Sequence, residues 1–183
     1  MNYNELVGLD NILSCWREFK RGKMKKADVM EFDRHREDNI FRLHEELMNR
    51  TYCHGSYRSF NVYDPVPRVI SKASVRDRLV HRVVFDELYR IFDPTFYFHS
   101  YSSRLEKGTH LAIQNLSSCL RRASRNYTHN VYILKCDIRK FFASVNHDKL
   151  LEIICERVAD ENILSLIKKI IDSFPVGLPL GNV

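Results

Sequence analysis

The first third of the chain carries apolar residues at helical spacing. Two helices are predicted there, over residues 4–19 and from Ala27 to about Met48, with a basic connector between them. Their apolar anchors are Leu6, Ile12, Trp16 and Phe19 in the first helix and Ile40, Leu43 and Leu47 in the second. Residues at this spacing share one helix face, so we expect both stripes to lie in the core.

The pattern changes to alternation in the segment "YRSFNVYDPVPRVIS". Apolar and polar residues alternate on either side of Pro65 and Pro67, which predicts two short strands joined by a proline turn. Ser74 and Asp77 then form the S-x-x-D pattern of a capping box. We therefore expect a helix to begin there and to continue as far as Asp93.

The last third combines one apolar run with several helix signals. The run from Val131 to Asp137 is nearly continuous, which predicts a central, buried strand. A helix is predicted before it from near Thr109, and two follow it, one capped by Asn146 and one opened by Asp160 and Glu161. Helices that alternate irregularly with a few strands are typical of the α+β class, which is the predicted fold class.

Composition excludes some functional classes without selecting one. The 183 residues are 44% hydrophobic and 28% charged, which is ordinary for a globular protein. The polar start is unlike a signal peptide and no apolar run is long enough to cross a bilayer, so we expect a cytoplasmic protein with no membrane partner. The five cysteines are widely spaced without a C-x-x-C pair, which favours reduced thiols over disulfides or a zinc site.

The positive net charge of +6 indicates an anionic partner. The basic residues gather in three stretches, at residues 17–26, 76–82 and 121–125. In the second stretch Arg78, His81 and Arg82 fall at positions i, i+3 and i+4, so we expect a basic ridge on one helix face. A solvated helix face explains any one stretch as well, but three stretches in an aromatic-rich chain favour nucleic acid.

Asp137 ends the predicted buried strand and is followed closely by Phe141 and Phe142. A carboxylate at low dielectric is costly unless it is paired or bound to a metal. One interpretation is a structural cap that accepts hydrogen bonds from the amides of the following turn. The other is one carboxylate of a two-metal phosphoryl-transfer site, in which oxygen ligands hold Mg²⁺ and an aromatic ring shapes the sugar pocket. The residues alone leave both open.

Four short motifs resemble reverse transcriptases and follow one another in that family's order. "DIRKFF" resembles the first palm motif and "PRVISKASVRDRLVHRVV" the fingers motif. "HSYSSRLEKGTHLAI" resembles the block that follows the fingers motif, and "GLPLGN" the opening of the next palm motif. Each motif is weak alone, but four in order along nearly the whole chain are specific. The chain therefore resembles a bacterial reverse transcriptase of the group II intron-like branch.

The resemblance implies a right-hand polymerase fold, represented by the fingers and the first part of the palm. Residues 1–50 would form an N-terminal helical extension, 51–128 the fingers and 129–183 a partial palm. The implied activity is RNA-directed DNA polymerisation with two Mg²⁺ ions. The implied partners are an RNA template, a DNA or RNA primer and deoxynucleoside triphosphates.

The family's functional positions carry over residue by residue. Asp137 would be the first catalytic carboxylate and a metal ligand, and the backbone carbonyl of Ile138 a second metal ligand. Phe142 would be the steric gate that excludes a ribose 2′-hydroxyl. Arg68 and Arg76 would contact the triphosphate. The other expected contacts are Leu180 with the nucleotide, and Arg78, Arg82, Arg104 and Lys107 with nucleic acid.

This sequence also departs from the family pattern. The lysine that usually precedes the fingers arginine has no counterpart, since Asp64, Pro65 and Val66 fill that stretch. Leu180 stands where the intron enzymes carry glutamine, which is similar to enzymes of diversity-generating retroelements. Arg104 is explained equally well as a salt-bridged loop arginine.

The family's remaining catalytic acids form a Y-x-D-D turn, and this chain contains no adjacent pair of aspartates. We therefore expect the N-terminal portion of a polymerase, inactive alone because one carboxylate cannot organise two metal ions. The alternative is a non-catalytic nucleic-acid-binding or protein-scaffold module that keeps the fold. A third possibility is an unrelated α+β domain with basic surfaces.

Overall fold

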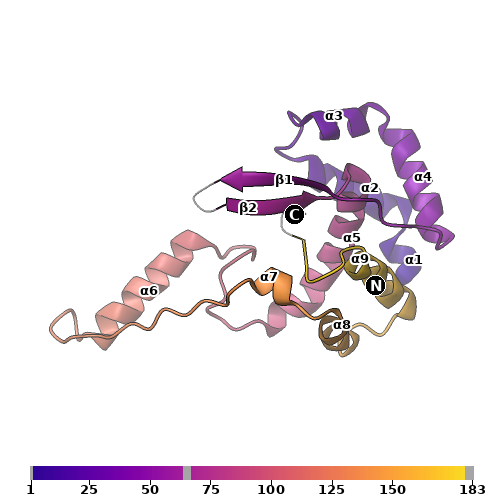
Figure 1. Cartoon of the computed structure of the whole chain (residues 1–183). Helices are drawn as coiled ribbons and strands as arrows, with labels where there is room; N and C mark the ends of the chain where they lie inside the picture. Colours follow the sequence, from indigo (N-terminus) through magenta and orange to yellow (C-terminus); the bar gives the residue numbers. More distant parts are fainter. Residues whose placement is uncertain (1, 64–66, 180–183) are drawn as a thin grey trace. The chain divides into compact units, whose positions relative to one another are not determined.

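The computed structural model describes residues 2–63 and 67–179. The chain divides into two compact units, one formed by Met1–Tyr89 with Lys140–Val183 and the other by Arg90–Arg139 (Figure 1). These bounds differ from the boundaries at residues 50 and 128 that the family resemblance implies. The division into extension, fingers and palm remains a prediction.

The first unit begins with two helices where the sequence predicts one. Helix α1 (Tyr3–Leu6) carries a capping box between Asn2 and Glu5, and α2 (Leu9–Lys20) follows after a break at Gly8. Gly8 has extended backbone dihedral angles and forms the N-cap of α2, which is why a single helix does not continue. The predicted anchors are confirmed as core, since all four are buried: Leu6, Ile12, Trp16 and Phe19.

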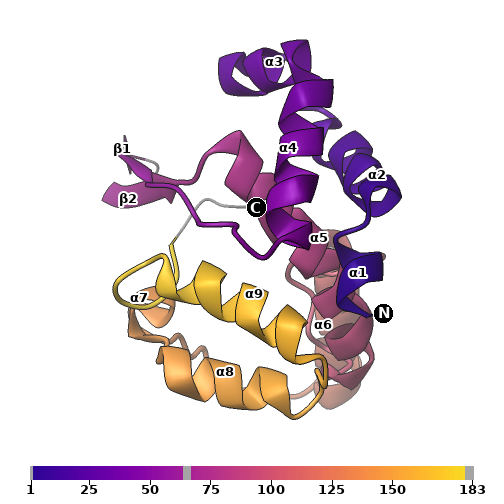
Figure 2. The same cartoon turned by 90° about the vertical axis from the view of Figure 1, so that its right-hand side faces the viewer.

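The second predicted helix is also divided. Helix α3 (Ala27–Arg34) ends at His35, whose backbone leaves the helical region, and α4 (Arg36–Met48) begins directly after it. Helix α4 packs against α2, as Figure 2 shows. Its predicted apolar stripe is confirmed as core, because Ile40, Leu43 and Leu47 are buried.

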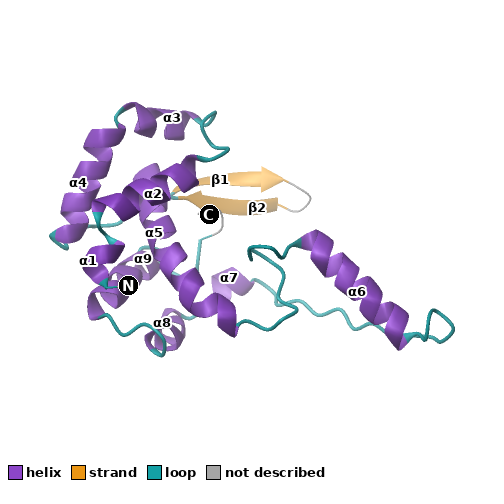
Figure 3. Ribbon diagram, turned by 180° about the vertical axis from the view of Figure 1, so that it is seen from behind, coloured by secondary structure: helices purple, strands orange, loops and turns teal. Residues whose placement is uncertain are grey.

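The predicted pair of strands forms an antiparallel hairpin. Strand β1 (Arg58–Tyr63) pairs with β2 (Pro67–Lys72), so that Arg58 lies opposite Lys72 at the base of the hairpin. Figure 3 shows the hairpin as the regular sheet in a mostly helical chain. The predicted proline turn, with Asp64, Pro65 and Val66, lies outside the described residues.

Helix α5 (Val75–Phe92) begins at the predicted Ser74–Asp77 pair. The hydroxyl of Ser74 accepts from the Asp77 amide and donates to the Asp77 carboxylate, which confirms the helix start. The Asp77 carboxylate is completely buried and also accepts from the Tyr52 hydroxyl at 2.9 Å and the Gly55 amide at 3.2 Å. Asp77 therefore joins α5 to the loop that leads into β1.

The C-terminal segment of the first unit contains three helices, α7 (Phe141–Ser144), α8 (His147–Cys155) and α9 (Glu161–Asp172). Asn146 caps α8, as predicted, and Asp160, which is predicted in the first turn of its helix, is the N-cap of α9. Asp160 also accepts from the amide of Tyr3 at 2.8 Å, which ties α9 to the first helix of the chain. Burial alone would raise the pKa of Asp160, but three backbone amides hold that pKa below its usual value.

The second unit contains the short 3₁₀ turn Asp93–Thr95 and helix α6 (Thr109–Ala123). Helix α6 is amphipathic, yet none of its residues is fully buried. The prediction of a central, buried strand at 131–137 is wrong in this structure: the segment is a loop, and Tyr132 and Leu134 are 94% and 87% exposed (Figure 3). No other described segment forms a ladder with it, and without a neighbouring strand neither backbone pairing nor burial is available.

None of the helices in the described part of the chain combines the length and apolar character needed to span a bilayer.

We expect Asp77→Asn to lower the free energy of unfolding by about 3 kcal/mol, because it disrupts a buried, charge-assisted hydrogen-bond network. Denaturant titration of the purified chain measures this loss. The matched control is Asp172→Asn, which removes a carboxylate that is about half exposed and bound to Lys168, and it should cost less than about 1 kcal/mol. Equal losses in the two variants would contradict a central role for Asp77.

Candidate functional site

The end of the predicted first palm motif, at Phe141 and Phe142, meets the Gly/Pro loop near the end of the chain in the first unit. The backbone carbonyl of Phe142, at the start of α7, accepts a hydrogen bond from the Leu178 amide at 2.8 Å. The His147 ring bonds the Gly177 carbonyl through its Nε2 at 2.6 Å, so His147 carries the proton on that nitrogen. Two motifs more than thirty residues apart are thus held together by backbone contacts.

Gly177 makes this approach possible because it has no side chain. A Cβ at this position would lie 2.2 Å from the Phe142 carbonyl oxygen and 2.7 Å from the Ala143 Cα, both backbone atoms. Gly177 also has φ +67°, in the left-handed region that other residues rarely adopt. The glycine of the "GLPLGN" motif is therefore required by the packing of the loop on α7.

The aromatic side chains of α7 remain accessible. Phe142 is 46% exposed and Phe141 is 50% exposed, and their rings contact each other edge to face at 5.4 Å between centroids. A ring of this exposure can contact a ligand, which leaves the predicted gate role of Phe142 open. Leu180, the other residue predicted to contact the nucleotide, lies outside the described residues.

Asp137 and Ile138 belong to the second unit, where both are exposed in the loop after α6. The structural-cap interpretation of Asp137 gains no support, because none of the described residues forms a hydrogen bond or an ion pair with its carboxylate. Within residues 2–63 and 67–179, no group of three or more histidine, cysteine or carboxylate side chains could hold a metal ion. One carboxylate and one carbonyl do not make a complete Mg²⁺ site.

The two arginines predicted to contact the triphosphate differ in their surroundings. Arg68 is exposed on β2, opposite Val62, and is free to contact a ligand. The guanidinium of Arg76 instead forms ion pairs with Glu46 and Asp77 and lies over the Tyr52 ring. Arg76 therefore has a structural role in this unit, and its contact with a nucleotide remains a prediction.

The expected exposed basic ridge on α5 is wrong for Arg78. Its side chain is only 5% exposed, bonds Asp28 at 2.5 Å and contacts the Phe19 ring. Arg82 is partly exposed, but its Nε donates to Asp86 one turn further along the helix. The i, i+3, i+4 pattern places residues on one helix face but does not show whether another element packs against part of that face, as Asp28 of α3 does at Arg78.

Arg104 and Lys107 organise the loop that precedes α6. Arg104 donates to the Asp93 carboxylate, with its Nε 2.6 Å from Oδ1, and also to the backbone carbonyls of Asp93, Tyr97 and Ser100. Lys107 donates to the Phe98 carbonyl and lies over the Phe98 ring. The structure supports the salt-bridged loop arginine for Arg104, and the contacts of both residues with nucleic acid remain predictions.

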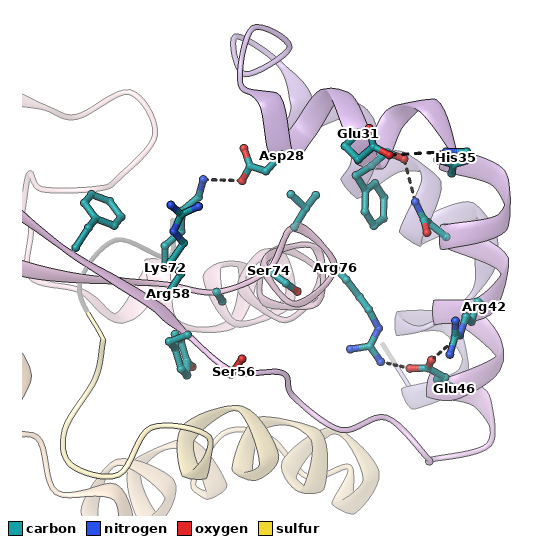
Figure 4. A pocket seen from close by; sticks show the side chains of 16 residues that line it. Asp28, Glu31, His35, Arg42, Glu46, Ser56, Arg58, Lys72, Ser74 and Arg76 are labelled. Atoms are coloured by element: carbon teal, nitrogen blue, oxygen red, sulfur yellow. Dashed lines mark hydrogen bonds and ion pairs between the residues drawn. The ribbon is translucent and has the colours of Figure 1, made fainter.

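A cleft of about 1140 Å³ opens between α3, α4, the hairpin and the start of α5, all in the first unit (Figure 4). It is lined by charged residues that sequence analysis did not select, among them Arg58 and Lys72. The register of the predicted hairpin pairs Arg58 with Lys72, and this pair of like charges is a signal in the sequence for an anion site. No spacing in the sequence indicates that α3 and α4 lie across from them.

We expect Gly177→Ala to destabilise the chain by at least about 2 kcal/mol more than Gly22→Ala, because its methyl group collides with backbone atoms. Gly22 has a similar φ of +71° but open space where the Cβ would lie, so its substitution measures the backbone strain alone, about 1–2 kcal/mol. Denaturant titration and hydrogen exchange at the Leu178 amide measure the two effects. Similar losses in both variants, with unchanged exchange, would contradict the close packing.

Comparison with known proteins shows distant similarity of this chain to parts of longer proteins. No protein-family model matches the chain. It is 27% identical over 106 residues to the "Uncharacterized 91 kDa protein in cob intron" of Schizosaccharomyces pombe, covering 58% of this chain and 12% of that protein. It is 26% identical over 104 residues to "Protein YkfC" of Escherichia coli K12, covering 57% of this chain and 27% of that protein. The chain is therefore similar, at a distance, to part of an intron-encoded protein and spans less than a third of either relative.

Proposed function

We propose that the chain is the N-terminal part of an RNA-directed DNA polymerase that copies RNA into DNA by two-metal nucleotidyl transfer. It would contribute the fingers and the first part of the palm of a right-hand polymerase fold. The substrates would be an RNA template, a DNA or RNA primer and deoxynucleoside triphosphates. The chain by itself would be inactive.

The contact between α7 and the Gly177 loop is the observation that carries this proposal. The family resemblance puts a sugar gate in one motif and a nucleotide-contacting loop in the other. In the structure the Phe142 carbonyl bonds the Leu178 amide, and Gly177 lies against the same turn. A pocket for one nucleotide requires these two motifs to be neighbours. The similarity to a protein in a cob intron supports the same proposal.

Mg²⁺ requires more ligands than the described residues provide. Asp137 is an exposed carboxylate with no cationic partner in the described part of the chain, so it is available to a metal ion. Hard divalent ions take about six oxygen ligands, and two-metal catalysis needs carboxylates on both ions. The proposal therefore requires additional acids from a longer polypeptide, in agreement with the small share of each relative that this chain covers.

The alternative function is a non-catalytic nucleic-acid-binding or scaffold module with the same fold. The ion pairs of Arg76, Arg78 and Arg104 favour it, because these arginines maintain the fold of their own units and this role requires no catalysis. The two functions differ in whether Asp137 matters. A scaffold needs no free carboxylate at that position, whereas a polymerase loses its activity without one.

Asp137→Asn, made in a chain that continues through a Y-x-D-D turn, should abolish primer extension while leaving the melting temperature unchanged. The amide keeps the shape of the side chain but loses the charge that would hold the metal ion. Primer extension on an RNA template measures activity, and Asp148→Asn removes a comparable exposed carboxylate from α8 as the control. Full activity of the Asp137 variant would rule out the catalytic assignment.

In the same extended chain, Phe142→Ala should relax discrimination against ribonucleotides, because the ring would occupy the space of a 2′-hydroxyl. Primer extension with each nucleotide type gives the ratio of incorporation rates. The neighbouring Phe141→Ala is the control, since its ring has nearly the same exposure. An active Phe142 variant with unchanged selectivity would show that the ring is not a gate.

A further inference from the structure

The cleft beside the hairpin has an excess of positive charge at one end. Arg58, Lys72 and Asp28 lie together there, as Figure 4 shows. Arg58 and Lys72 are direct cross-strand partners in the antiparallel pair, and like charges in this position repel each other. Arg58 has no ion-pair partner among the described residues, so its charge is not compensated.

The carboxylates that line the cleft already have cationic partners. Glu46 pairs with Arg76 and Arg42, at the far end from the hairpin. Glu31 pairs with Arg34 and is 3.8 Å from the His35 ring. Neither Glu31 nor Glu46 forms an ion pair with Arg58.

Asp28, the remaining acid, is shared between two cations. Lys72 Nζ and Arg78 Nη2 each lie 2.5 Å from the same oxygen, Oδ2. Burial by itself would raise the pKa of Asp28, but the hydrogen bond from Lys72 and the nearby Arg78 charge hold that pKa below its usual value. The carboxylate therefore stays ionised at neutral pH and still balances only one of its two partners.

Two further features show that the surrounding charge is unbalanced. Arg78 is 5% exposed, and its Nε is a buried donor with no hydrogen-bond partner in the described structure. Lys23 contacts the Phe19 ring that Arg78 also contacts. Burial, followed by the charges of Arg78, Lys26 and Arg82, lowers the pKa of Lys23. An additional anion would relieve this repulsion.

The remaining walls of the cleft suit a phosphate group. Ser74, Val75 and Arg76 at the start of α5 also line the cleft, and the buried Asp77 carboxylate already balances the positive end of this helix. Aromatic residues line it as well, namely Phe32, Tyr57 and Phe60. Cations are the usual partners of phosphate, and aromatic rings beside them suit an attached base.

We propose that this end of the cleft is a binding site for a phosphate group, held by Arg58 and Lys72 at the base of the hairpin. The buried Arg78 lies behind it and contributes charge through the shared Asp28. The site requires no metal ion, no catalytic carboxylate and no polymerase activity, so it stands separately from the proposed function.

Titration of the chain with inorganic phosphate tests the site, with the ³¹P resonance and the melting temperature followed at constant ionic strength in chloride. Phosphate should raise the melting temperature where chloride does not. Arg58→Gln and Lys72→Gln should each weaken phosphate binding about tenfold, since each loses a charge-assisted hydrogen bond. Lys149→Gln, which removes an exposed cation on α8, should bind phosphate as the unchanged chain does.

The Arg58 variant separates binding from folding. Without phosphate, Arg58→Gln should be as stable as the unchanged chain or more stable, because it removes a repulsive cross-strand pair. It should nevertheless lose the stabilisation by phosphate. Undiminished phosphate binding in the Arg58→Gln, Lys72→Gln double variant, or equal effects of phosphate and chloride, would overturn the proposal.

A short single-stranded oligothymidylate distinguishes the two sources of the phosphate. Displacement of bound inorganic phosphate by the oligonucleotide would assign the site to a polynucleotide backbone. Retention of inorganic phosphate in its presence would assign the site to a small phosphorylated molecule. Both results keep the site, and both are measured without polymerisation.

Discussion

The buried carboxylate of Asp77 determines how the first unit is arranged. An ionised group in the interior must be fully hydrogen-bonded, and here the donors come from Tyr52, Gly55, Ser74 and Arg76. Burial, followed by the charge of Asp77, raises the pKa of the Tyr52 hydroxyl, which therefore stays protonated and donates. These bonds join the loop before β1 to the start of α5, and so they set two walls of the cleft.

The internal contacts of the basic residues change how the net charge of this chain is interpreted. Arg76, Arg78 and Arg104 hold carboxylates and carbonyl groups within their own units. Arg58 and Arg68, on the hairpin, are exposed and have no such partners among the described residues. The hairpin therefore offers charge to an anionic partner, whereas Arg76 and Arg78 of α5 are paired with acids on α4 and α3.

The two segments that the family resemblance assigns to nucleotide binding differ in their local contacts. The turn at Phe142 and the loop at Gly177 are joined by a backbone hydrogen bond and a contact too close for any other residue. The segment that contains Asp137 has exposed apolar side chains and no strand beside it in the described chain. A strand gains its stability from neighbours on both edges and from burial of its faces, and both depend on residues far away in sequence.

The sequence by itself determined the helices, their caps and their buried faces. Asn146 caps a helix where predicted, Asp160 lies at the predicted start of another, and the anchor Trp16 is in the core, because caps and periodicity act within a few residues. Only the tertiary structure decided that Arg78 is buried and that Gly177 lies against Phe142. It also decided that Arg58 and Lys72, which are neighbours on the hairpin, lie on the opposite side of the cleft from α3. These outcomes depend on which distant segments pack together, and the local pattern of charge and hydrophobicity is the same whichever partner a residue finds.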